Sequence, residues 1–166
     1  MDETTGGRVE AIFLAVGPRG AGPRTRVAEV RAVEGKGLEG DRFFGHVDGP
    51  RAKWRGERQV TLIEAEAVEA MRALGRDFAP GDSKRNVVTR GVPLNDLVGR
   101  EFHVGGAVLR GVELCDPCTH LGRTTWRGIE RDLADRGGLR AAVVRGGEIR
   151  EGDAVVWGGV RECVSA

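Results

Sequence analysis

The chain has 166 residues with 26 basic and 25 acidic side chains, a length that suits one domain with one core. The balanced charge disfavours nucleic acid and anionic membranes as partners. Its three cysteines are too few for a secreted disulfide framework, and the sequence shows neither a signal peptide nor an apolar run of about 20 residues. These features predict a soluble cytoplasmic protein.

The N-terminal part of the chain carries strand and turn signals. Residues 9–16 and 26–33 are β-rich runs, and the Pro- and Gly-rich segment between them cannot continue either strand. A hairpin-like pair is the simplest interpretation. The glycine- and charge-rich segment 34–56 is too long for a simple connection, so we expect it to cover or build a site.

A helix is predicted in the middle of the chain. Residues 58–63 are typical of a strand, and residues 64–74 are typical of a helix because apolar side chains recur at helical spacing before Gly75. Residues 84–115 then alternate strand and turn signals. This helix is expected to plug one end of a sheet.

The C-terminal part of the chain again combines a short helix with strands. Trp126, Ile129 and Leu133 are spaced for a second short helix, and strands are predicted at residues 139–145 and 153–157. Six to eight short strands without regular βαβ alternation favour a mainly β fold, of the β-rich α+β kind. We therefore expect a closed or nearly closed β-barrel with two or more short helices.

The expected domain covers residues 9–157. Residues 1–8 are polar and glycine-containing and are predicted to form a flexible N-terminus, and residues 158–166 a C-terminal tail.

The segment V-E-L-C-D-P-C-T-H-L is the predicted reaction centre, because it places Cys115, Cys118 and His120 at the end of an apolar run. A zinc site would need a second close pair of ligands, and a thioredoxin-type dithiol would open a helix in a βαβ unit. We favour a single reactive thiolate at Cys118, with His120 beside it. An inert buried cysteine is the alternative, and it suits Cys115, which continues an apolar strand.

Two further motifs could bind an anionic ligand. The loop K-G-L-E-G-D-R offers glycine N–H groups beside basic side chains, although a turn with Asp41 paired to an arginine is the alternative. A basic residue followed by an amide opens two predicted strands, where these side chains could line a barrel mouth or be solvated. The candidate binding residues are Lys36, Gly37, Gly40, Asp41, Arg42, Arg58, Arg85 and Asn86.

Five ordered blocks resemble the MOSC domain, named after the C-terminal domain of molybdenum cofactor sulfurases. They are G-L-E-G-D-R, R-Q-V-T-L-I-E-A-E-A, K-R-N-V-V-T-R-G-V-P-L-N-D-L-V-G-R, E-L-C-D-P-C-T-H-L and L-R-A-A-V-V-R-G-G-E-I-R-E-G-D. The resemblance runs from about residue 9 to residue 156. It implies a β-barrel and a single family cysteine, which falls on Cys118.

The resemblance implies two activities that use a molybdenum-pterin cofactor. In the first, Cys118 carries sulfur as a persulfide; in the second, it ligates molybdenum in a reductase of N-hydroxylated compounds. The chain resembles neither a pyridoxal-phosphate desulfurase nor a ferredoxin, so either activity implies a separate cysteine desulfurase or electron-donor protein. The expected ligand is a pterin or another small molecule. The remaining alternative is a non-catalytic binding module that serves a partner protein and in which Cys115 and Cys118 merely pack or pair.

Overall fold

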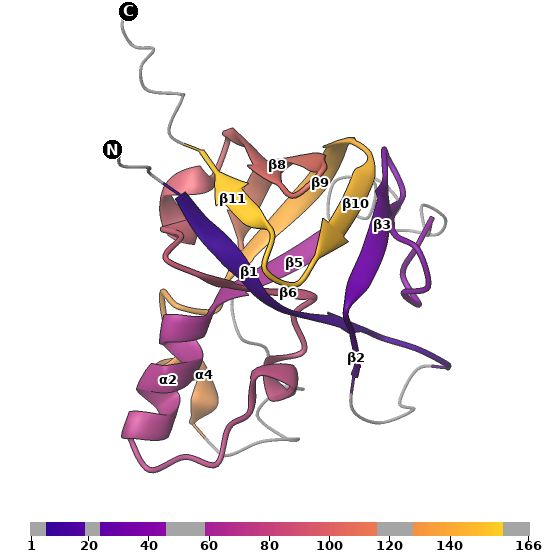
Figure 1. Cartoon of the computed structure of the whole chain (residues 1–166). Helices are drawn as coiled ribbons and strands as arrows, with labels where there is room; N and C mark the ends of the chain where they lie inside the picture. The colour runs from indigo at the N-terminus through magenta and orange to yellow at the C-terminus, as the bar shows by residue number, and fades with distance from the viewer. Residues whose placement is uncertain (1–5, 19–23, 46–58, 116–127, 158–166) are drawn as a thin grey trace, which may run out of the picture.

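The computed structural model describes residues 6–18, 24–45, 59–115 and 128–157, and its longest sheet closes into a barrel (Figure 1). β1 pairs with both β6 and β11, which joins the two ends of the sheet, and β2 adds to β1 outside the ring. Closure leaves few unpaired strand edges. The predicted β-barrel is therefore confirmed. Around the ring the strands are β11 (Ala154–Val156), β7 (Glu101–Val104), β8 (Ala107–Leu114), β9 (Leu139–Arg145), β5 (Val60–Glu64), β6 (Val87–Arg90) and β1 (Gly6–Leu14), with β2 (Thr25–Val27) beside β1.

A second, three-stranded sheet lies beside the barrel, in the order β10 (Gly147–Arg150), β3 (Glu29–Val33) and β4 (Gly37–Leu38). The predicted hairpin is confirmed only for β1 and β2, which pair antiparallel. The run predicted as one strand at residues 26–33 is divided: β3 leaves β2 and pairs with β10. The strand β10 was not predicted from the sequence.

One pair of neighbouring barrel strands is parallel. β5 and β6 run in the same direction, with Leu62 opposite Val87, and the other pairs within the barrel are antiparallel. Parallel neighbours need a long crossover, usually through a helix. The helix α2 (Ala65–Ala73) lies in this crossover and matches the predicted helix at residues 64–74.

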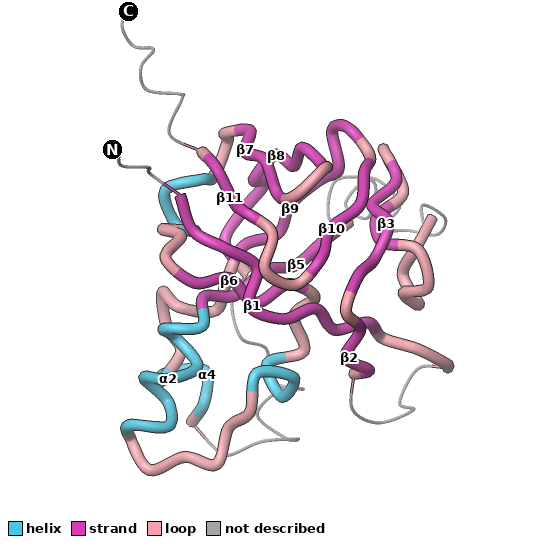
Figure 2. The backbone as a smooth tube through the Cα atoms, in the orientation of Figure 1, coloured by secondary structure: helices cyan, strands magenta, loops and turns pink. Residues whose placement is uncertain are grey.

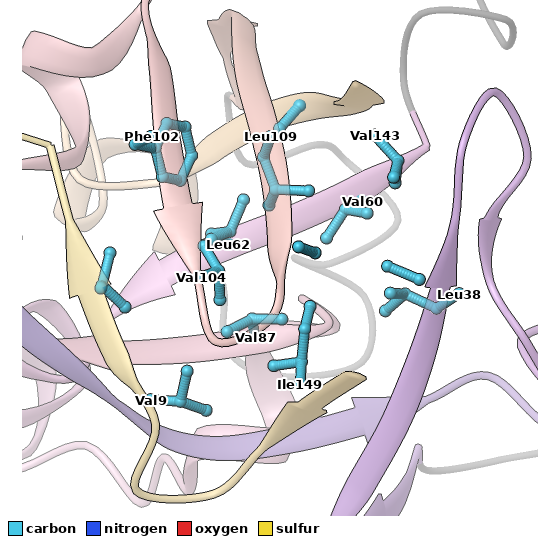
Figure 3. Close-up of a cluster of buried hydrophobic side chains, with 14 of the residues drawn as sticks. Val9, Leu38, Val60, Leu62, Val87, Phe102, Val104, Leu109, Val143 and Ile149 are labelled. Carbon is cyan, nitrogen blue, oxygen red and sulfur yellow. The ribbon is translucent and has the colours of Figure 1, made fainter. Parts of the chain in front are cut away.

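The barrel interior holds the main core, and its side chains come from alternate positions of the strands (Figure 3). On β5, Val60 and Leu62 belong to this interior cluster, whereas Ile63 faces a second cluster. Successive side chains of a strand point to opposite faces, so one strand supplies both clusters. The core labelled in Figure 3 includes Val9, Leu38, Val87, Phe102, Val104, Leu109, Val143 and Ile149.

The second cluster packs the helices against the outside of the barrel. α2 and α4 (Ile129–Asp132) lie together on one side of the strands (Figure 2), and Val68 and Met71 of α2 share the cluster with Ile129 of α4. Two 3₁₀ helices, η1 (Pro80–Ser83) and η2 (Leu94–Leu97), complete the described elements. No helix among the described residues is long and apolar enough to cross a membrane.

Glu64, where β5 meets α2, predicts a pH dependence of stability. Its carboxylate accepts a hydrogen bond from Leu94 N at 3.0 Å, but burial raises the pKa of Glu64, and Glu66 adds to this effect. The folded state therefore binds a proton more tightly than the unfolded state. The stabilisation from that proton is lost as the pH rises above the ordinary glutamate pKa of roughly 4.3 and through the raised pKa of the folded state.

We expect Glu64→Gln to raise the urea midpoint at pH 7 and to change it little at pH 4, because glutamine stays neutral and keeps an acceptor for Leu94 N. Glu69→Gln on the same helix is the control. Arg90 lowers the pKa of Glu69 through a hydrogen bond, so this substitution should not stabilise the protein at pH 7. An equal gain from both variants would contradict the assignment to Glu64.

Candidate functional site

A pocket of about 230 Å³ lies where the starts of β5 and β6 meet the C-terminal end of β8. A volume of about 30 Å³ per water molecule makes this space large enough for several waters or a small ligand group. The described residues that line the pocket are Arg24, Asp41, Phe43, Gln59, Thr61, Lys84, Arg85, Asn86, Cys115 and Arg140.

The lining of the pocket is strongly basic. Its described residues include three arginines and one lysine but a single carboxylate, that of Asp41. The chain as a whole is nearly neutral, so this is a local concentration of positive charge. Converging guanidinium and ammonium groups bind phosphate and carboxylate groups.

Asp41 is occupied by internal hydrogen bonds. Its Oδ1 accepts from Ala15 N at 2.7 Å and from Asn86 Nδ2 at 3.3 Å, and its Oδ2 accepts from Phe43 N at 3.2 Å. The residue is buried. Asp41 therefore holds the loop after β4 against β1, and its charge is already satisfied by donors of the fold.

Asn86 connects this carboxylate to β5. Its Oδ1 accepts from Thr61 N at 3.1 Å and from Thr61 Oγ1 at 3.2 Å, and its Nδ2 also donates to Phe13 O at 3.0 Å. Asn86 is buried, so removal of its amide would leave each of these groups without its partner in the protein. The pocket wall is thus a connected polar network.

Arg24 is a largely buried basic group of the pocket wall. Its side chain is 15% exposed, and its ion pair within the described residues joins Nη1 to Asp41 Oδ1 at 3.9 Å. Burial lowers the pKa of the Arg24 guanidinium; Asp41 opposes this shift, and the charges of Arg42 and Arg85 add to it. A bound anion would favour the charged guanidinium, so Arg24 is well suited to ligand binding.

Cys115 closes another side of the pocket. Its Sγ accepts a hydrogen bond from Arg140 Nε at 3.4 Å, and its carbonyl oxygen accepts from Arg85 Nη2 at 3.4 Å. The predicted burial of Cys115 is confirmed, with 1% exposure. Cys115 nevertheless lies in the wall of a polar pocket and its sulfur contacts a guanidinium, neither of which was predicted from the sequence.

The described residues that were predicted to bind a ligand separate into two groups. Asp41, Arg85 and Asn86 line the pocket, whereas Lys36, Gly37, Gly40 and Arg42 do not. Arg42 instead donates from Nε to Gly17 O at 2.9 Å, with its guanidinium 5.6 Å from the Phe43 ring centre. The predicted residues Cys118, His120 and Arg58 lie outside the described residues.

Three basic residues of the pocket were missed. Lys84 directly precedes Arg85 and Asn86 in the K-R-N motif, so the motif could have indicated it. Arg24 directly precedes β2 and Arg140 lies in β9, far away in the sequence, and no local motif marks either residue. Within the described ranges, no group of three or more His, Cys, Asp or Glu side chains could hold a metal ion.

Comparison with known proteins agrees with this architecture. YuaD from Bacillus subtilis aligns with a TM-score of 0.76 and 20% identity, over 93% of this chain and 97% of that one. YiiM from Geobacillus stearothermophilus aligns with a TM-score of 0.65 and 16% identity, over 91% and 74%. YiiM from Escherichia coli aligns with a TM-score of 0.62 and 19% identity, over 90% and 69%. At these identities the similarity concerns the fold.

A search among functionally curated proteins gave no match. The MOSC domain family matches residues 23–156, which cover most of the chain and include every described residue of the pocket. The chain therefore belongs to the MOSC domain family.

Proposed function

We propose that this protein binds a molybdopterin-type cofactor in the basic pocket and handles sulfur through Cys118. The observation that carries the proposal is the pocket itself, which is lined by four basic residues and by one carboxylate that already accepts hydrogen bonds from the fold. Cys115 contributes to its wall and precedes Cys118 by three residues. This arrangement would bring an anionic ligand close to the C-x-x-C segment.

The donor groups of the pocket suit the phosphate end of such a cofactor. Arg24, Lys84, Arg85 and Arg140 supply the positive charge, and the buried guanidinium of Arg24 would gain a counter-ion. Asp41 and Asn86, which were predicted as ligand-binding residues, would position the wall rather than bind the phosphate, because they bond to each other and to the backbone. When bound, the cofactor would supply a molybdenum centre for sulfur or oxygen-atom chemistry.

Sulfur transfer is a balanced exchange at Cys118. Its thiolate would attack the terminal sulfur of a persulfide on a separate cysteine desulfurase, and the donor cysteine would leave as a thiolate. No oxidant or reductant is consumed. His120, two residues away in sequence, would take up the thiol proton.

The direct test is pterin and molybdenum analysis of protein purified from a host that makes molybdenum cofactor. We expect Arg24→Gln to weaken the affinity for the pterin about 10- to 100-fold, because a hydrogen bond to a charged group contributes about 1.5–3 kcal/mol. The purified variant should therefore contain less pterin than wild type. Arg26→Gln is the matched control: Arg26 is two residues away, pairs with Glu151 at the surface and does not line the pocket. It should retain the wild-type pterin content.

Cys118→Ala separates the two activities in the same experiment. A persulfide carrier would keep its pterin and lose sulfur uptake from a desulfurase. Loss of molybdenum with retained pterin would instead favour the reductase of N-hydroxylated compounds, with Cys118 as the metal ligand. Wild-type protein without pterin from a competent host would contradict the proposed cofactor binding.

A further inference from the structure

Three consecutive residues, Lys84, Arg85 and Asn86, line the same pocket. In a continuous extended strand, successive side chains point to opposite faces. Here the backbone is not extended throughout, because it turns at Lys84. β6 begins only at Val87, directly after these residues.

Lys84 makes that turn. It caps η1 in the left-handed conformation, with φ 63° and ψ 27°, and its N–H donates to Gly81 O at 3.3 Å. Ser83 fixes the turn, since its Oγ donates to Pro80 O at 2.9 Å and accepts from Arg85 N at 3.3 Å. A β-carbon makes this backbone conformation unfavourable, and glycine is the usual residue for it.

The backbone conformation at this position favours glycine, so a function of the lysine side chain would explain why lysine is found here. Within the described part of the chain, Lys84 has no carboxylate partner within ion-pair distance, and the residue lines the pocket together with Arg24, Arg85 and Arg140. Non-glycine residues in left-handed backbone are concentrated at functional sites, where the surrounding structure maintains them. Among the described residues, no hydrogen bond or ion pair holds the Lys84 side chain elsewhere in the fold.

We infer that Lys84 is an anion-binding residue, and that its left-handed turn places three consecutive side chains around one phosphate-like group. This inference rests on the anion pocket of the proposed function and adds a specificity-determining residue to it. The class of ligand is a compound with a phosphate group or a similar oxyanion. Arg85 and Asn86 form the adjoining wall, held by Gly137 O and by Thr61.

The test compares Lys84→Gly with wild type by calorimetric titration with inorganic phosphate at low ionic strength. Glycine suits the left-handed backbone, so this variant should keep or raise Tm and weaken phosphate binding at least about tenfold. Lys84→Asn provides a second variant that tolerates this backbone without the positive charge. It should show the same loss.

Asp135→Gly is the matched control. Asp135 is the other non-glycine residue with positive φ among those described, at 64°, and it does not line the pocket. We expect its substitution to keep or raise Tm and to leave phosphate binding unchanged. A salt-matched sulfate titration shows whether the site accepts oxyanions in general.

Each outcome decides a separate question. If wild type binds phosphate and Lys84→Gly binds it equally well, the role of Lys84 is wrong and the anion pocket stands. If wild type binds no phosphate, both the pocket and this inference are wrong. If phosphate binding depends on Lys84 but no pterin is found in the purified protein, the inference stands and the proposed cofactor is wrong.

Discussion

Replacing Asn86 with alanine is expected to lower the free energy of unfolding by about 3 kcal/mol, because it leaves several buried polar groups without partners. Thr61 N and Phe13 O would lose their hydrogen bonds to the amide, and Asp41 Oδ1 would lose one of its donors. Asn86 and Asp41 are buried, so water from the pocket would replace these contacts only in part. Urea unfolding followed by circular dichroism measures the change.

Asn95→Ala is the appropriate control for the loss of an asparagine amide. Asn95 is exposed and donates a hydrogen bond from Nδ2 to Asp135 O at 2.9 Å. Surface substitutions of this kind change stability by about 0.5 kcal/mol or less. If Asn86→Ala cost no more than Asn95→Ala, the polar network would not stabilise the pocket wall.

The sequence was sufficient to predict the class of fold because the relevant signals are local. Helical spacing at residues 64–74 predicted α2, and the β-rich runs predicted most barrel strands. The parallel pairing of β5 with β6 and the departure of β3 toward β10 could not be predicted in this way. Both depend on contacts between distant segments, which periodicity does not encode.

The residues that line the pocket could likewise be predicted only where a local motif marks them. Arg85 and Asn86 were predicted from their position at the start of a strand, and both line the pocket. Arg24 and Arg140 belong to segments more than a hundred residues apart, and nothing distinguishes them locally among the 26 basic residues of the chain. Closure of the barrel brings them together, so only the fold identifies them.

The glycine-rich loop at residues 36–42 was predicted to bind a ligand, but its backbone N–H groups have a structural role. Lys36 N donates to Val33 O at 3.0 Å, Glu39 N to Arg31 O at 2.9 Å and Asp41 N to Leu38 O at 3.2 Å. These N–H groups therefore shape the turn and the small sheet around β3 and β4. Ligand binding by Lys36, Gly37, Gly40 and Arg42 stays a prediction, whereas Asp41 has a visible structural task in the pocket wall.

Gly138→Ala is expected to have the largest effect on stability, about 4 kcal/mol, because it combines backbone strain with overlap in a closely packed region. Gly138 has φ 109°, and an added β-carbon would overlap Leu62 O on the neighbouring strand β5. Its own carbonyl oxygen accepts from Cys115 N at 2.7 Å. Displacement of this segment would therefore move Cys115 and open the pocket wall as well as weaken the barrel.

Gly152→Ala separates the two causes, because Gly152 also has a positive φ, 92°, but an added β-carbon would meet no atom within 4 Å. Strain alone should cost this control about 1 kcal/mol. Urea unfolding gives both values, and phosphate titration of the folded variants reports on the pocket. If the two variants lost equal stability, the contact of Gly138 with β5 would not limit the residue at this position. If Gly138→Ala were strongly destabilised yet bound phosphate like wild type, the junction of β8 and β9 would support the barrel without positioning the anion site.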